Sequence, residues 1–196
     1  MRQALNPLNQ KSSLLLHICC VGCGVYASQL LKQDYDIMLF FYNPNIWPEE
    51  EYNKRLAEAE KIAEQFNLKL IEGAYDHNRW LEAVRGREND PERGQRCLIC
   101  YKFRLDKAAA VAKKLNREYL ITTLTTSPHK DALAVNKIGQ GAAANFQLKF
   151  LTQDLKKQDG FKKSAALSRQ LGLYRQNYCG CEFSRSHNPQ LLTKKT

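Results

Sequence analysis

The sequence predicts an α/β fold, a Rossmann-like (HUP-like) parallel sheet with flanking helices in a single compact domain. Short apolar runs alternate with segments of helical periodicity along the chain. No internal repeat or low-complexity linker divides it, and 196 residues suffice to bury a core. Alternating strands and helices need right-handed crossovers, and these produce a parallel sheet with helices on both faces.

Five short apolar runs are the predicted strands. The longest of them, YDIMLFFY, is typical of a buried strand. The expected strands are Leu14–Ile18, Tyr35–Tyr42, Leu68–Glu72, Tyr119–Thr122 and Leu148–Leu151.

Segments with apolar residues three and four positions apart lie between these runs and predict helices. The expected helices are Glu49–Phe66, Tyr101–Leu115, Ser28–Lys32 and Ser164–Leu171. The polar segment Asp76–Arg96 is expected to form a long loop or short helices over the site. We expect residues 1–13 to be a flexible N-terminal segment, 14–185 the domain, and 186–196 a basic tail.

No apolar run approaches the roughly 20 residues that span a bilayer. The N-terminal residues also lack the apolar region of a secretory signal. We therefore expect a cytoplasmic protein. Cytoplasmic thiols are kept reduced, so clustered cysteines there indicate a metal site or redox chemistry rather than structural disulfides.

The cysteines are the most unusual feature of the sequence. Seven are present, an odd number that a fully paired disulfide framework cannot use. They fall into three tight groups, HICCVGC at 17–23, RCLIC at 96–100 and YCGC at 178–181.

The first of these groups follows the first predicted strand. Other polar motifs follow the other strands: NPNIWP, AYDHNRW and TTLTTSPHKD. Ligands of open parallel sheets bind beyond the carboxyl ends of the strands. We therefore expect these segments to converge on one edge of the sheet.

Spacing alone leaves three kinds of site open: an iron–sulfur cluster, a zinc site or a redox dithiol. Zinc takes four ligands in a tetrahedral structural site. A [4Fe–4S] cluster also takes four thiolates. Either one leaves three of the seven cysteines without a role.

The motifs together resemble one family, the cobalamin-independent epoxyqueuosine reductases of the QueH type. The resemblance runs from about Leu14 to Ser184, and one departure is CCVGC where the family commonly has CCAPC. It rests on LLLHICCVGC, FYNPNIWPEEEYNKR, ERGQRCLICYKFRL, TTLTTSPHKD and YRQNYCGCEFS.

The resemblance implies an oxidoreductase that converts epoxyqueuosine to queuosine at wobble position 34 of tRNA, the last step of queuosine biosynthesis. The substrates would be the tRNAs with GUN anticodons, for Tyr, His, Asn and Asp. The resemblance also implies a [4Fe–4S] cluster beside a separate mononuclear iron held by cysteines and a carboxylate. As a hypothesis, Cys20, Cys97, Cys100 and Cys181 hold the cluster, and Cys19, Cys179 and Asp76 hold the iron.

The reaction removes the epoxide oxygen as water and requires two electrons and two protons. Tyr178 and His129 are the candidate proton donors. No dinucleotide fingerprint G-x-G-x-x-G is present, so an external electron donor is expected.

The formal charge of +10 suits a polyanionic partner such as tRNA. The best basic patch is Lys156, Lys157, Lys162, Lys163, Arg169 and Arg175. The alternatives are a zinc-stabilised RNA-binding module and a thiol oxidoreductase. An adenylating tRNA-modification enzyme is a further alternative, but the pyrophosphate loop S-G-G-x-D-S is missing.

Overall fold

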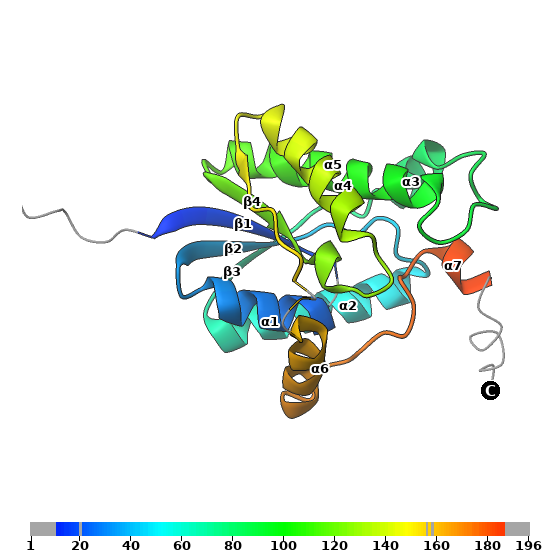
Figure 1. The fold of residues 1–196 in the computed structure, drawn as a ribbon. Helices are drawn as coiled ribbons and strands as arrows, with labels where there is room; N and C mark the ends of the chain where they lie inside the picture. Colours follow the sequence, from blue (N-terminus) through cyan, green and yellow to red (C-terminus); the bar gives the residue numbers. More distant parts are fainter. Residues whose placement is uncertain (1–10, 20, 156, 158, 187–196) are drawn as a thin grey trace, which may run out of the picture.

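The computed structural model describes residues 11–19, 21–155, 157 and 159–186. Five parallel strands form one sheet in the order β3-β2-β1-β4-β5 (Figure 1). This confirms the predicted α/β class, and each strand lies within two residues of its expected bounds. The strands are β1 (Ser12–Ile18), β2 (Tyr35–Phe41), β3 (Lys69–Glu72), β4 (Tyr119–Thr122) and β5 (Lys149–Phe150).

The central strand β1 explains why the sequence near the N-terminus is so apolar. Leu14 pairs with Ile37 of β2 on one side and with Tyr119 of β4 on the other. Successive side chains of a strand point to opposite faces. Accordingly, Leu14 and Leu16 belong to one buried cluster and Leu15 belongs to another.

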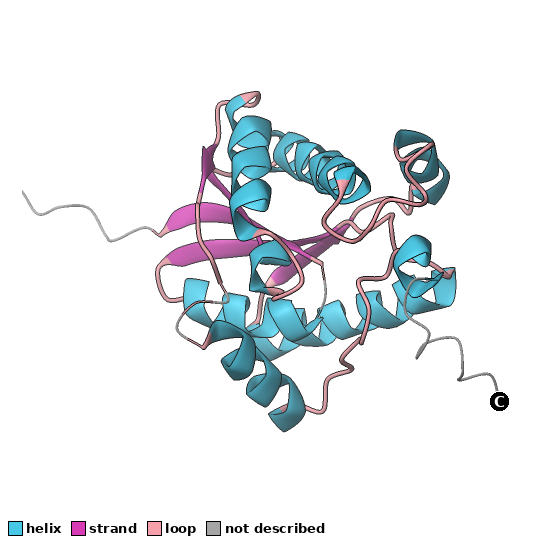
Figure 2. Cartoon of the chain, turned by 45° about the vertical axis from the view of Figure 1, so that its right-hand side comes forward, coloured by secondary structure: helices cyan, strands magenta, loops and turns pink. Residues whose placement is uncertain are grey.

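Helices cover both faces of the sheet (Figures 1 and 2). The helices α1 (Val21–Leu31), α2 (Glu49–Phe66) and α6 (Gly160–Gln170) lie on one face. On the other face lie α4 (Gln95–Lys114) and α5 (Ala132–Ala144). No helix of the described residues is both long enough and apolar enough to cross a membrane.

The bounds of α2 agree with the prediction, whereas α1 and α4 begin earlier than predicted. The first turns of α4 contain Arg96, Cys97 and Cys100, which do not follow an apolar periodicity. Cys100 packs with Trp80 and Val84 of the segment before α4, so tertiary contacts support a start that local pattern does not indicate.

Helix α5 was not predicted because its sequence, ALAVNKIGQGAAA, includes two glycines that weaken helices. The carboxylate of Asp131 caps it by accepting hydrogen bonds from the amides of Leu133 at 2.8 Å and Ala134 at 3.2 Å. Gly139 permits close packing, since a Cβ there would lie 2.2 Å from the ring of Phe150. The glycine that lowers helix propensity is therefore required by the contact with β5.

The polar segment after β3 contains α3 (His77–Ala83) and a loop that leads into α4. A second short helix, α7 (Glu182–Ser186), lies near α3. This agrees with the predicted alternative of short helices. Residues 1–10 of the predicted N-terminal segment and 187–196 of the predicted tail lie outside the described residues.

Candidate functional site

The carboxyl ends of β1 and β4 meet at Cys19 and Thr123. The amide of Cys19 donates a hydrogen bond to Oγ1 of Thr123 at 3.1 Å, and the Thr123 hydroxyl donates to Sγ of Cys19 at 3.4 Å. The chain continues from β1 to β2 on one side and from β4 to β5 on the other, so the strand order reverses between β1 and β4, which is where open α/β sheets bind ligands. Cys19 and Cys23 are both buried there.

His17 ties this edge together and is not exposed. Its Nε2 lies 3.1 Å from the carbonyl oxygen of Tyr42. Because that oxygen can only accept, Nε2 carries the proton and donates a hydrogen bond to it. Its Nδ1 therefore accepts from the hydroxyl of Thr122, 2.8 Å away. Burial, with a smaller effect of Arg104, lowers the pKa of His17 to about 3. The imidazole is thus a neutral structural link.

Helix α4 brings Cys97 and Cys100 to the same edge on one helical face, three residues apart. The amide of Arg93 donates a hydrogen bond to Sγ of Cys97 at 3.3 Å. Burial raises the pKa of both thiols, and for Cys100 the neighbouring charge of Arg104 opposes this increase.

The segment Cys179–Gly180–Cys181 supplies the third pair of thiols. Gly180 has φ +104°, a left-handed conformation that glycine adopts without strain. The amide of Cys181 donates to Sγ of Cys179 at 3.5 Å. A hydrogen bond between the two thiols lowers the pKa of Cys179 and raises that of Cys181.

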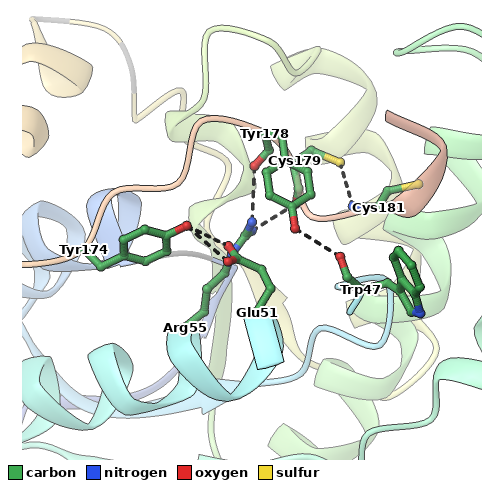
Figure 3. A network of polar contacts seen from close by, with 7 residues as sticks. All are labelled: Trp47, Glu51, Arg55, Tyr174, Tyr178, Cys179 and Cys181. Atoms are coloured by element: carbon green, nitrogen blue, oxygen red, sulfur yellow. Dashed lines mark hydrogen bonds and ion pairs between the residues drawn. The ribbon is translucent and has the colours of Figure 1, made fainter. Parts of the chain in front are cut away.

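A buried arginine of α2 fixes this segment (Figure 3). Arg55 donates hydrogen bonds to the carbonyl oxygens of Cys179 at 3.1 Å and Tyr178 at 3.4 Å. Its Nε forms an ion pair with Glu51 at 2.7 Å, and the hydroxyl of Tyr174 donates to the same carboxylate. The motif EEEYNKR thus holds the segment that carries the last two cysteines.

Four cysteines share the lining of a small cavity of about 40 Å³, namely Cys97, Cys100, Cys179 and Cys181. They come from two distant segments of the chain. Trp80, Tyr101, Arg96 and Arg104 also line it. Nε1 of Trp80 and Nε of each arginine are buried, and hydrogen bonds from the Trp80 and Arg104 side chains to the thiol of Cys100 oppose the increase of its pKa. The lining therefore combines thiols with buried N–H donors.

A larger cavity of about 510 Å³ adjoins the small one. Both cavities are lined by Glu92, Arg104, His129, Lys130, Cys179 and Ser184. The larger one also has Cys19, Cys23, Arg55, Arg175 and Tyr178 in its wall. The lining of the larger cavity has a formal charge of +3. It contains one carboxylate, Glu92, and four cations, Arg55, Arg104, Lys130 and Arg175.

The predicted site residues fall into three groups. Cys97, Cys100, Cys179 and Cys181 lie together, and Cys19, Cys179, Tyr178 and His129 line the larger cavity. Asp76 is not among the lining residues of either cavity, and its carboxylate accepts a hydrogen bond from Tyr42 at 3.1 Å. Cys20 lies outside the described residues, as does Lys156 of the predicted basic patch.

Within the described part of the chain, no three His, Cys, Asp or Glu side chains form a group that could hold a metal ion. The four thiols are nevertheless suitable ligands in kind and number for a [4Fe–4S] cluster. The buried N–H donors of the lining suit a group rich in anionic sulfur.

Sequence reasoning missed Arg55, Trp80, Arg104 and Glu92. Their side chains reach the site only through the packing of α2, α3, α4 and the loop before α4. All four do lie inside quoted motifs, Arg55 in FYNPNIWPEEEYNKR, Trp80 in AYDHNRW, and Glu92 and Arg104 in ERGQRCLICYKFRL, and this was the available signal.

Two examples represent the solved structures that resemble this fold. One is the U34-tRNA thiolase NcsA from Methanococcus maripaludis with its [4Fe–4S] cluster, with a TM-score of 0.57 and 11% sequence identity. The likeness covers 89% of this chain and 62% of that one. The other is a predicted subunit of tRNA methyltransferase from Methanocaldococcus jannaschii, with a TM-score of 0.53 and 14% identity over 78% of this chain and 74% of that one. At these identities the likeness shows the fold alone.

Sequence comparison identifies the family. Residues 14–187 match the family described as Epoxyqueuosine reductase QueH. A relative of that name from Streptococcus pyogenes serotype M1 is 36% identical over 180 residues, or 89% of this chain and 71% of the relative. Another from Thermotoga maritima is 36% identical over 178 residues, covering 88% of this chain and 90% of the relative. The chain therefore belongs to the QueH family of epoxyqueuosine reductases, as its motifs predicted.

Proposed function

We propose that this protein reduces epoxyqueuosine to queuosine at wobble position 34 of tRNA, the last step of queuosine biosynthesis. Family membership supports the reaction. The observation that carries the proposal for this chain is the junction of two cavities, one lined by four cysteines and one large and positively charged. A redox group and a nucleotide would thereby lie next to each other.

The cysteines of the small cavity are the proposed ligands of a [4Fe–4S] cluster. When bound, the cluster would supply electrons one at a time. Cys97, Cys100 and Cys181 were predicted as ligands together with Cys20. Since Cys179 lines the same cavity as those three, it is an equally suitable fourth ligand. The hydrogen bond that lowers the pKa of Cys179 favours its thiolate, which is the form that binds metal.

A separate mononuclear iron is a further part of the proposal, with Cys19 as one ligand. Asp76 was the predicted carboxylate. Glu92 is the only carboxylate in the lining of the two cavities among the described residues, which supports it as a competing candidate. Asp76→Ala and Glu92→Ala distinguish the two candidates. The measurement is the iron that each variant binds in excess of the irons of the cluster.

The larger cavity is the proposed binding site for nucleotide 34. Enzymes that act on a base take it out of the stack, and single-stranded loops are read through stacking and base-edge contacts. The volume of about 510 Å³ is in the range of small-molecule pockets. Its cations suit the phosphates that flank the inserted base. Selectivity for GUN anticodons is the corresponding expectation for the substrate tRNAs.

Two residues of this cavity are the proposed proton donors. Tyr178 lines it, and its hydroxyl donates a hydrogen bond to the carbonyl oxygen of Trp47 at 3.0 Å. His129 lines both cavities and is exposed, so it can exchange protons with solvent. Reduction of the epoxide requires two protons, and its oxygen leaves as water. The two electrons come from an external donor.

The first experiment is anaerobic purification followed by absorbance, iron and sulfide analysis. We expect about four sulfides and four to five irons per chain, with absorbance near 400 nm that bleaches on reduction. Stoichiometric zinc without sulfide would instead support a zinc-stabilised RNA-binding module. A tRNA carrying epoxyqueuosine should then be converted by the reduced protein, with free nucleoside as the comparison substrate.

The fourth cluster ligand is tested with Cys20→Ala and Cys179→Ala. The variant in which the true fourth ligand is replaced should lose the cluster absorbance and the sulfide, whereas the other variant should keep both. Cys23→Ala is the matched control, because Cys23 is a buried cysteine of the same edge that the proposal assigns to neither metal. Loss of the cluster in Cys23→Ala would contradict the assignment.

A further inference from the structure

Three buried N–H groups lie in the wall of the small cavity. They are Nε1 of Trp80, Nε of Arg96 and Nε of Arg104. Native structures leave few buried donors without a partner. Nε of Arg96 has no partner among the described residues, whereas the side chains of Trp80 and Arg104 hydrogen-bond to the thiol of Cys100. A group bound by the thiols of this cavity of about 40 Å³ therefore meets donors that already lie against sulfur.

The chemistry of that group follows from the donors. An indole N–H and a guanidinium N–H donate hydrogen bonds and accept none. Two of the three side chains also carry a positive charge. The bound group is therefore an anion with several acceptor atoms that lies among four thiols. The sulfurs of a cysteine-ligated iron–sulfur cluster have these properties.

Trp80 is held in place by aromatic contacts. It is 0% exposed, and its ring stacks on His77 with centroids 5.8 Å apart and on Phe183 with centroids 6.0 Å apart. The contact with Phe183 joins α3 to α7, the two short helices near the beginning of α4 (Figure 1). Trp80 also packs in one buried cluster with Cys100 and Cys181. Its indole is thus a rigid donor beside two of the thiols.

The two arginines are fixed by their other nitrogens. Nη1 of Arg96 donates to the carbonyl oxygens of Arg87 at 3.1 Å and Glu88 at 2.6 Å. Nη2 of Arg104 donates to Oδ1 of Asn43, and Nδ2 of Asn43 donates to the carbonyl oxygen of Ile18 at 3.0 Å. Both side chains are therefore oriented before anything binds.

We propose that Trp80 and Arg104, assisted by Arg96, donate N–H hydrogen bonds to sulfur atoms of the bound cluster and raise its reduction potential. The proposal rests on the cluster proposed above. Reduction adds negative charge to the cluster, and donors and nearby cations stabilise the more negative form. Hydrogen bonds to the sulfurs are among the factors that set such potentials. Trp80 and Arg104 are positioning residues that act on the substrate only through the cluster.

The test is a potentiometric titration of the cluster in Trp80→Phe and Arg104→Gln, monitored by absorbance and electron paramagnetic resonance. We expect both potentials to shift to more negative values. Trp47→Phe is the matched control, because the only other tryptophan is 42% exposed and lines neither cavity. Its potential should equal that of the unmodified protein. Variant potentials equal to the control would overturn the proposal.

A second measurement does not depend on the folding of Trp80→Phe. In Trp47→Phe, Trp80 is the only tryptophan, so labelling with ¹⁵N-indole tryptophan marks a single side chain. Pulsed electron paramagnetic resonance of the reduced cluster should detect coupling to this nitrogen. A loaded cluster without that coupling would overturn the tryptophan's role and leave the proposed function intact. Absence of iron and sulfide from the unmodified protein would overturn both.

Discussion

The guanidinium of Arg55, which is 1% exposed, donates a hydrogen bond to the carbonyl oxygen of Cys179 at 3.1 Å. The same side chain pairs with Glu51 at 2.7 Å (Figure 3). An interaction between residues 124 positions apart thus attaches the C-G-C segment to α2. Cys179 and Cys181 reach Cys97 and Cys100 because this attachment brings the end of the chain back to the sheet edge.

Replacement of Arg55 by methionine should lower the free energy of unfolding by about 3–5 kcal/mol, because it leaves Glu51 without its partner in a mostly buried site. It should also reduce the iron bound per chain. Chemical denaturation and iron analysis measure the two effects. Arg85→Met is the control, since the exposed side chain of Arg85 has no hydrogen bond or ion pair among the described contacts, and it should change stability by at most about 0.5 kcal/mol. Equal stabilities for the two variants would contradict the role of Arg55.

Replacement of Gly180 by alanine should strain the same segment. At φ +104° a side chain is disfavoured, and a Cβ would lie 2.9 Å from Cγ1 of Ile46 and 3.0 Å from Nη1 of Arg55. We expect a loss of about 1–3 kcal/mol in the free energy of unfolding, together with weaker iron binding.

Gly141→Ala is the matched control for this change. Gly141 lies within α5, and a Cβ there would meet nothing within 4 Å. Alanine should stabilise this helix by about 0.5–1 kcal/mol. If Gly180→Ala were as stable as Gly141→Ala, the strain at Gly180 would be refuted.

The stability of the protein should depend on pH through His17. Its pKa is lowered from 6.5 to about 3 by burial, so below pH 6.5 the unfolded state binds a proton that the folded state does not. The contribution of His17 is complete above pH 6.5 and is lost as the pH falls toward 3, by about 1.4 kcal/mol per pH unit.

The measurement compares the unmodified protein with His17→Gln by denaturation between pH 4 and 8. The variant is less stable at neutral pH, because it loses the paired hydrogen bonds to Thr122 and Tyr42. Its stability should fall less steeply below pH 6.5. Parallel curves for the two proteins would show that His17 does not titrate on unfolding in this range.

Binding of tRNA should depend on Arg175, which lines the larger cavity and has no hydrogen bond or ion pair among the described contacts. Arg175→Gln should weaken binding and reduce the slope of log affinity against log salt by about one. Fluorescence anisotropy at several salt concentrations measures this slope.

Lys114→Gln removes an equal charge as the control. Lys114 is exposed at the last residue of α4, about 25 Å along the helix from Cys97. It should leave the slope unchanged. An equal effect of both variants would indicate that overall charge, rather than the cavity, determines affinity.

Local pattern determined much of this fold. The apolar runs marked all five strands, and the continuous periodicity of Glu49–Phe66 gave the bounds of α2. Helix α5 was not predictable in this way, because Gly139 is there for the approach of Phe150 from β5 and lowers helix propensity. A contact between distant segments can thus override the local preference that sequence reasoning uses.

The sequence by itself determined the family, the class of chemistry and the cysteines that could take part, since motif spacing is a local property. Only the tertiary structure decided which cysteines share a cavity, because Cys97 and Cys179 approach through the packing of α2, α4 and the C-G-C segment. It also decided that Arg55 holds this segment, that Asp76 bonds to Tyr42 and that Glu92 lines both cavities. These facts depend on side-chain directions across distant elements, which no local pattern encodes.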